Sequence, residues 1–475
     1  FGNDNNTIDN CYIRDGATTP SNGIYSSGTG TTTTHYNSGI TISNCNIFNF
    51  YNSTSSLNAG VGIYINEYNM DWTISGNSFY QTETRRFFTN GEPTHNAILI
   101  SSSTVNNTLI SGNYIGGTAA LCGGTAMTFS TTDYLVYRAI QLSVGFITPT
   151  TLQGNTIQNI AITTSSSSSA QSLISAVTGS INVTGNTLGS QSSTNSVTFT
   201  QSTHSTDAVF SGINAGTGTS GLLEGSINIL NNTIGGIAAF SSSSGTLSLR
   251  GISMKGTFTS TISGNTIGST TTANSISSNV VYGSLFGIFS ASTTVVNNTT
   301  NNTVANLSYS GLGSSVQIVG ILLQGSSDGA FTTTGNTVRN LTSNSANTGT
   351  NSLASVIGIS HTAEISAGQT LSQNTIYGLS NNHSTSAVCV TGIHFAGPTS
   401  GTNVVSRNFI YGLNIVSTSA AADMRGINFT HGYTNVQNNM IRLGYDASGT
   451  ALTTGIQITG LFDGSSVNRM YFNSV

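Results

Sequence analysis

The sequence predicts an all-β solenoid of about 13 coils with three short strands per coil, because two sequence motifs, here called phrases, recur at matching intervals along the chain. The first phrase is an apolar residue, a polar residue, a bend and then an anchor residue, as in residues 262–267. It returns about every 35 residues, which is a spacing typical of repeat arrays. The anchor positions are Cys11, Cys45, Asn77, Asn113, Asn155, Asn186, Asn232, Asn265, Asn302, Asn336, Asn374, Asn408, Asn439 and Met470.

The second phrase is a Gly-Ile pair inside an alternating segment, as in Gly320-Ile321-Leu322-Leu323. Period-two alternation indicates a strand, with Ile facing inward and the next residue outward. The thirteen isoleucines are Ile24, Ile63, Ile98, Ile140, Ile174, Ile213, Ile252, Ile288, Ile321, Ile359, Ile393, Ile427 and Ile456. The residues that follow them are expected to form an uncharged outer face, for example Tyr64, Gln141, Asn214, Ser253, Asn428 and Gln457.

The anchor phrase supplies the other two strands of each coil. A strand leads into the bend, where Gly and Asn tolerate the left-handed backbone best. Apolar residues after the anchor, as in Ala305-Asn306-Leu307, predict the third strand. Since equivalent positions of successive coils stack, the eleven anchor asparagines are predicted to form one ladder.

The composition limits the partners. Only 5% of residues are charged and the net charge is −4, so no basic surface for nucleic acid is expected. No apolar run reaches about 18 residues, so membrane insertion is not expected. Residues 216–221 match the dinucleotide fingerprint, but no helix and no acidic residue follow at the required places, so no cofactor is predicted. His361, His394 and His431 lie at different registers of successive coils, so no metal site is predicted. Regularly spaced apolar residues, 36% of the total, favour an ordered fold over disorder. Because a repeat array need not split into globular domains, one continuous domain over 1–475 is expected.

The stacked coils resemble the right-handed, single-stranded parallel β-helix of the pectin-lyase-like superfamily, with its asparagine ladder. The Ile/Val-Ser-Gly-Asn-Thr-Ile coils, with Phe79-Tyr80-Gln81-Thr82 in an early coil, are similar to large secreted surface proteins of Bacteroidetes exported by type IX secretion. This resemblance implies an extracellular or cell-surface location. We expect a piece of a longer protein, with the remainder of its own chain as a partner at both ends.

Two function classes follow from that resemblance. The first is a non-enzymatic β-helical rod, a stalk or adhesin region that binds carbohydrate or another surface protein. The second is a polysaccharide lyase or glycoside hydrolase of the same fold. The resemblance implies an acid cluster for such an enzyme, and acids rarely neighbour one another here, so no catalytic residue is assigned. Arg250 and Lys255, with Glu224 nearby, resemble the basic site of metal-free lyases.

Residues 66–95 form the most highly charged segment and are expected to be a loop-rich insertion. Aromatic rings beside carboxylates and arginines are typical of sugar-binding sites. The alternative is a folded loop whose ion pairs and rings cover the side of the solenoid. The candidate binding residues are Tyr64, Glu67, Tyr68, Asp71, Trp72, Tyr80, Glu83, Arg85, Arg86, Glu92 and His95.

Cys11 and Cys45 occupy the anchor position of successive coils, where the asparagine ladder would otherwise begin. Stacking at about 4.8 Å would bring their Cα atoms within the range of a disulfide. The alternative is that two small side chains fill the corner without a bond, since parallel stacking points both Cβ atoms the same way. Cys122 and Cys389 are expected to be free thiols.

Overall fold

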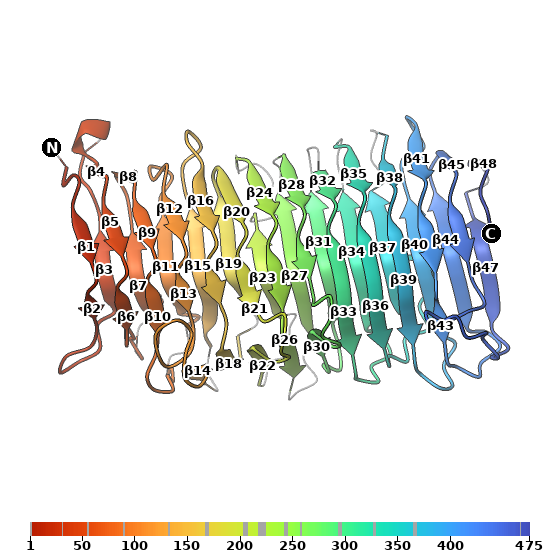
Figure 1. The fold of residues 1–475 in the computed structure, drawn as a ribbon, viewed down its shortest axis with the longest axis horizontal. Helices are drawn as coiled ribbons and strands as arrows, with labels where there is room; N and C mark the ends of the chain where they lie inside the picture. Colours follow the sequence, from red (N-terminus) through yellow and green to blue (C-terminus); the bar gives the residue numbers. More distant parts are fainter. Residues whose placement is uncertain are drawn as a thin grey trace. The chain divides into compact units, whose positions relative to one another are not determined.

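The chain is a parallel β-solenoid of about 12 turns, built from three parallel sheets that each run through the successive coils (Figure 1). It falls into two compact units, unit 1 (Phe1–Thr217 and Leu222–Gly245) and unit 2 (Gly218–Gly221 and Thr246–Val475). The predicted fold class and the three strands per coil are confirmed. The computed structural model describes residues 2–30, 32–54, 57–88, 91–131, 134–166, 171–202, 208–216, 225–241, 246–256, 259–292, 297–325, 329–363, 368–465 and 467–475.

The recurring isoleucines lie in one sheet, here called the isoleucine sheet. In unit 1 its strands are β3 (Asn22–Ser26), β7 (Asn58–Ile65), β11 (Thr94–Ser101), β15 (Val136–Ser143), β19 (Gln171–Thr178) and β23 (Ala208–Ala215). In unit 2 they are β27 (Leu247–Gly256), β31 (Ser284–Ser292), β34 (Gln317–Gly325), β37 (Val356–Ala363), β40 (Cys389–Ala396), β44 (Asp423–His431) and β47 (Gln457–Asp463).

The isoleucines that the sequence predicts to face inward pair from strand to strand within each unit and form a single row, here called the file, except at the last member. Ile288 pairs with Ile321, which pairs with Ile359, and all three are fully buried. Gly320 precedes Ile321 because a Cβ there would lie 2.4 Å from Cγ1 of Val338 on the facing sheet. Ile456 does not belong to the file, since Leu461 pairs with Ile427.

The strands before the anchors form the anchor sheet. In unit 1 they are β1 (Thr7–Asp9), β5 (Thr41–Ser43), β9 (Thr73–Ser75), β12 (Leu109–Ser111), β16 (Thr150–Gln153), β20 (Ile181–Thr184) and β24 (Ile227–Leu230). In unit 2 they are β28 (Ser260–Ser263), β32 (Asn297–Thr300), β35 (Phe331–Thr334), β38 (Thr370–Ser372), β41 (Asn403–Ser406), β45 (Thr434–Gln437) and β48 (Arg469–Tyr471).

The corner after each anchor-sheet strand is a left-handed residue followed by the anchor. In unit 2 the left-handed residues are Gly264, Asn301, Gly335, Gln373, Arg407, Asn438 and Phe472, with φ between 51° and 70°. The backbone N–H of each anchor from Asn265 to Asn439 donates to the Oδ1 of the next. The series ends on Asn473 and not on the predicted Met470, which pairs with Val436 inside β48.

All eleven predicted ladder asparagines are buried and hydrogen-bonded. In unit 1 each Nδ2 from Asn77 to Asn186 also donates to the Oδ1 of the next asparagine. In unit 2 Nδ2 of Asn265 donates to Oδ1 of Asn302 in the same way. A carboxamide suits the corner because it donates and accepts at once, which satisfies backbone groups that the bend leaves unpaired.

The third sheet follows the anchors. In unit 1 it contains β2 (Tyr12–Ile13), β6 (Asn46–Phe48), β10 (Ser78–Tyr80), β13 (Tyr114–Ile115), β14 (Met127–Ser130), β17 (Thr156–Ile157), β18 (Ile160–Thr164), β21 (Thr187–Gly189), β22 (Val197–Gln201), β25 (Thr233–Gly235) and β26 (Ile237–Ser241). In unit 2 it contains β29 (Thr266–Ile267), β30 (Ile276–Ser278), β33 (Thr303–Tyr309), β36 (Thr337–Ser343), β39 (Thr375–Asn381), β42 (Phe409–Tyr411), β43 (Asn414–Ile415) and β46 (Met440–Arg442).

Four short elements lie outside the three sheets. They are the paired strands β4 (Asn37–Ser38) and β8 (Asn69–Met70) and the 3₁₀ turns η1 (Thr33–His35) and η2 (Asn351–Leu353). Among the residues described, no helix has the length and apolar character needed to cross a membrane.

Candidate ligand-binding pocket

The sequence predicts an uncharged outer face on the isoleucine sheet, and in unit 2 part of that face is an apolar cluster. Pairing skips the Gly before each Ile, so Val319 pairs with Ile357 and Ile321 with Ile359. The strand therefore bends at Gly, and the residue two before the Ile lies beside the residue one after it. On β31 these two residues are Phe286 and Phe289, whose ring centroids are 5.5 Å apart.

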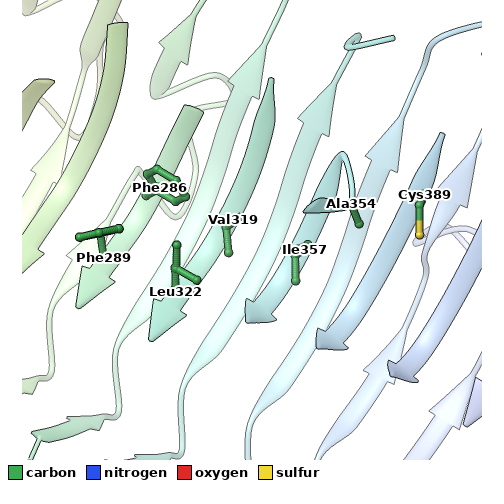
Figure 2. Packing of buried hydrophobic residues seen from close by; sticks show 7 residues of the cluster. All are labelled: Phe286, Phe289, Val319, Leu322, Ala354, Ile357 and Cys389. Carbon is green, nitrogen blue, oxygen red and sulfur yellow. The ribbon is translucent and has the colours of Figure 1, made fainter. Parts of the chain in front are cut away.

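Successive strands repeat this outward pair and build an apolar cluster. Figure 2 shows its members, which come from β31, β34, β37, β40 and the segment after η2. They are Phe286, Phe289, Val319, Leu322, Ala354, Ile357 and Cys389, and all are buried. An apolar face of this kind needs a cover, because exposing it to water is unfavourable.

Residues 344–354, here called the cover segment, supply part of that cover. Asn351 has a left-handed backbone, and its Oδ1 accepts hydrogen bonds from Nδ2 of Asn428 and Nη1 of Arg425, both at 3.1 Å. Nε2 of Gln317 on β34 donates to the carbonyl oxygen of Ser352 at 2.9 Å. The cover segment is therefore tied to β34 on one side and to β44 on the other.

A pocket of about 410 Å³ remains beside the cover segment. This volume lies within the range of small-molecule sites in proteins. Aromatic and aliphatic side chains meet hydroxyl, amide and guanidinium groups in its wall. The pocket, here called the Arg250 pocket, is lined by Ser248, Arg250, Ser284, Phe286, Phe289, Gln317, Leu322, Gln324, Ser352, Leu353 and Thr362.

Arg250 on β27 supplies the charge of the pocket. Its guanidinium carbon lies 3.8 Å from the ring centroid of Phe289, and its Nη1 donates to Oγ of Ser253 at 3.1 Å. Its Nε is buried without a hydrogen-bond partner among the residues described. Burial lowers the pKa of Arg250 to about 10, so the side chain stays cationic at neutral pH.

Lys255 lies on the same strand as Arg250 but does not line the pocket. Burial lowers the pKa of Lys255, and the neighbouring charge of Arg250 lowers it further. Glu224, the third member of the basic site that the sequence suggests, lies outside the described residues.

The candidate residues around 66–95 differ in how far they are buried in unit 1. Four of them, Trp72, Tyr80, Arg85 and His95, are buried, so their side chains support the fold. The imidazole of His95 stacks on Phe50, with centroids 5.3 Å apart, and burial lowers its pKa to about 3.

Arg85 is tied within the solenoid as well. Its Nη2 donates to Oδ1 of Asn49 and its Nε to Oε1 of Gln81, both at 2.8 Å. The carboxylate of Glu83 lies 3.8 Å from Nη1 of Arg85 and is itself exposed.

The other six candidates are at least partly exposed on unit 1. Tyr64 packs edge-on against Tyr25 at 5.3 Å, and Tyr68 against Tyr36 at 5.4 Å. Arg86 lines a smaller cavity of about 270 Å³ with Phe87 and Phe88. Asp71 accepts a hydrogen bond from Asn107 and Glu92 accepts one from Ser166, and Glu67 is exposed.

Cys11 and Cys45 are free cysteines in the structure, as are Cys122 and Cys389. The sulfur of Cys45 takes the place of a ladder carboxamide, because it accepts the backbone N–H of Cys11 at 3.4 Å and contacts the carbonyl oxygen of Ile8 at 3.7 Å. Asn77 makes the same two contacts with Cys45 and Ile42 one coil later. This arrangement matches the alternative in which the cysteines fill the corner without a bond.

No protein-family model matches the chain, and no curated protein or solved structure is detectably similar to it. Sequence analysis identified Arg250 as a candidate but missed the aromatic rings around it. The residues on either side of each Gly-Ile pair could have revealed them. These flanking residues are Arg250 and Ser253 in one coil, Phe286 and Phe289 in the next, and Val319 and Leu322 in the one after.

Proposed function

We propose that this chain is a non-catalytic β-helical stalk or adhesin region of a larger secreted bacterial protein, and that it binds carbohydrate through the Arg250 pocket. An extracellular or cell-surface location and type IX export are part of the proposal, which takes them from the similarity of the coils to surface proteins of Bacteroidetes. The resemblance to pectin-lyase-like β-helices supports the carbohydrate ligand.

The lining of the pocket is the observation that carries the proposal. Sugar rings have an apolar C–H face and a rim of hydroxyl groups. The rings of Phe286 and Phe289 suit the apolar face. The amides of Gln317 and Gln324 and the hydroxyl of Thr362 can donate to and accept from sugar hydroxyls.

A glycan array probed with the full chain tests this proposal. Phe289→Ala should abolish binding to any glycan that the wild type retains, because it removes the ring beneath the ligand. Phe409→Ala, a matched change of a partly exposed ring on the third sheet of the same unit, should leave binding intact. Binding that persists in Phe289→Ala but is lost in Arg86→Ser would place the site in unit 1 and refute the pocket.

A polysaccharide lyase is the second candidate, favoured by the lowered pKa of Lys255. When the pKa of an amine is lowered, a larger fraction of it is neutral near pH 7, and only the neutral form can abstract a proton. Incubation of the chain with a polysaccharide panel, with and without calcium, tests this role. New unsaturated or reducing ends that disappear in Lys255→Met would overturn the non-catalytic proposal.

A further inference from the structure

We propose that the Arg250 pocket selects sugars that carry an oxyanion, a carboxylate or a sulfate ester, over the neutral sugar with the same ring. This inference rests on the proposed carbohydrate function and specifies its ligand. The oxyanion would pair with the guanidinium of Arg250 while the ring packs on the side chains of Phe286 and Phe289.

Among the residues that the structure describes, Arg250 lacks the acidic partner that three other arginines have. Arg425 forms an ion pair with Asp423 at 2.6 Å, and Arg85 lies 3.8 Å from Glu83. The negative charge of Glu92 raises the pKa of Arg138, against the lowering effect of burial. Within the described residues no acidic side chain forms such a pair with Arg250, and burial is the cause of its lowered pKa. An uncompensated cation in a partly dry pocket favours an anionic ligand.

The hydrogen-bonding capacity of Arg250 is also incompletely used. The Nη1 contact with Ser253 accounts for one of the five N–H groups of a guanidinium. Nε is buried and has no partner within the structure as described. Because carboxylate and sulfate present two oxygens to a planar fork, they match the remaining donors better than a sugar hydroxyl does.

The apolar floor limits which anions fit. Phe289 lies against the guanidinium at 3.8 Å and Phe286 at 5.8 Å, so an ion bound to Arg250 lies beside two rings. A free, strongly hydrated anion would gain no apolar contact from those rings. An anionic group attached to a ring fills the same volume and covers the phenylalanines.

The test compares three probes with one ring and different substituents: methyl glucoside, glucuronic acid and glucose 6-sulfate. Titration calorimetry at low salt should give the full chain about a tenfold preference for each acidic probe over the neutral one, since charge-assisted hydrogen bonds are stronger. Arg250→Gln should bring all three affinities within about twofold of one another. Comparing the affinities of glucuronic acid and glucose 6-sulfate shows whether the pocket prefers a carboxylate or a sulfate ester.

Arg407→Gln is the matched control. Arg407 is exposed at a corner of unit 2, and Gln373 occupies the equivalent left-handed position one coil earlier, so glutamine suits its backbone. The acidic preference should persist in Arg407→Gln. If Arg250→Gln does not fold, Arg250→Lys keeps the charge without the planar fork and should lose most of the preference, whereas a full preference in that variant would overturn the inference.

Two results separate the proposals. Equal binding of neutral and acidic probes by the wild type, abolished by Phe289→Ala, would leave the carbohydrate site standing and overturn the oxyanion inference. If the wild type binds no probe and no array glycan, both proposals fall.

Discussion

Replacing Asn336 by alanine should be among the most destabilising single changes in unit 2. The carboxamide of Asn336 makes four hydrogen bonds at a buried corner. Its Nδ2 donates to the carbonyl oxygen of Thr299 at 2.9 Å and to Oδ1 of Asn374 at 3.0 Å. Its Oδ1 accepts the backbone N–H and Nδ2 of Asn302, both at 3.0 Å.

The magnitude follows from the groups that alanine would leave without a partner. These are the Thr299 carbonyl oxygen and two N–H groups of Asn302. A buried polar group left unpaired costs about 1 to 3 kcal/mol. Water that enters the space of the lost side chain can satisfy part of this demand, so we expect a total loss of about 3 to 5 kcal/mol.

Urea denaturation of the full chain, followed by circular dichroism, measures this loss as a lower midpoint for the transition of unit 2. Asn298→Ala is the control, because Asn298 lies on the neighbouring coil with its side chain partly exposed. Its effect should stay within about 0.5 kcal/mol. Amide hydrogen exchange at Asn302 should also accelerate in Asn336→Ala alone, since that N–H loses its acceptor.

Equal midpoints for Asn336→Ala and Asn298→Ala would refute the reasoning. Such a result would mean that the ladder merely occupies the corner, and that water replaces the carboxamide without cost.

Three further predictions concern the core and the thiols. Ile321→Ala should cost about 2 to 5 kcal/mol and Ile321→Val about 1, measured by urea denaturation, and equal costs would mean that the file is not tightly packed. Burial holds the pKa of His361 at about 4, below its usual 6.5, so its contribution to stability is complete above pH 6.5 and is lost as the pH falls towards 4. His361→Phe should therefore flatten the stability profile between these pH values, and an unchanged slope would contradict the assignment. Intact-mass analysis without reductant should find four alkylated cysteines in denaturant, whereas two would indicate a bond between Cys11 and Cys45. In the native state Cys122 should react slowest at pH 8, because burial raises its pKa to about 12, and Cys11 should react fastest, because it is exposed.

The last coil shows where pattern reading fails. The sequence offers Gly455-Ile456 and Gly460-Leu461 as candidates for the final Gly-aliphatic pair, and the alternation after Ile456 favours the first. The structure uses Leu461 and, in step with it, Asn473, which is 34 residues after Asn439. Spacing was the better guide, because hydrogen bonding between coils fixes the register of a strand more strictly than local alternation does.

The sequence by itself determined the coil of this protein, because every coil repeats the same nearest-neighbour contacts. Burying one aliphatic file and satisfying one corner requires Ile and Asn at fixed positions, and both are visible as a period. Only the tertiary structure decided the pocket. Asn351 contacts Asn428, which lies 77 residues further along the chain, and no periodicity encodes this contact. The cover segment thereby encloses Arg250 and Phe289 with residues from other coils. A non-periodic loop can dock in many places, and its position depends on which apolar surface is left to cover.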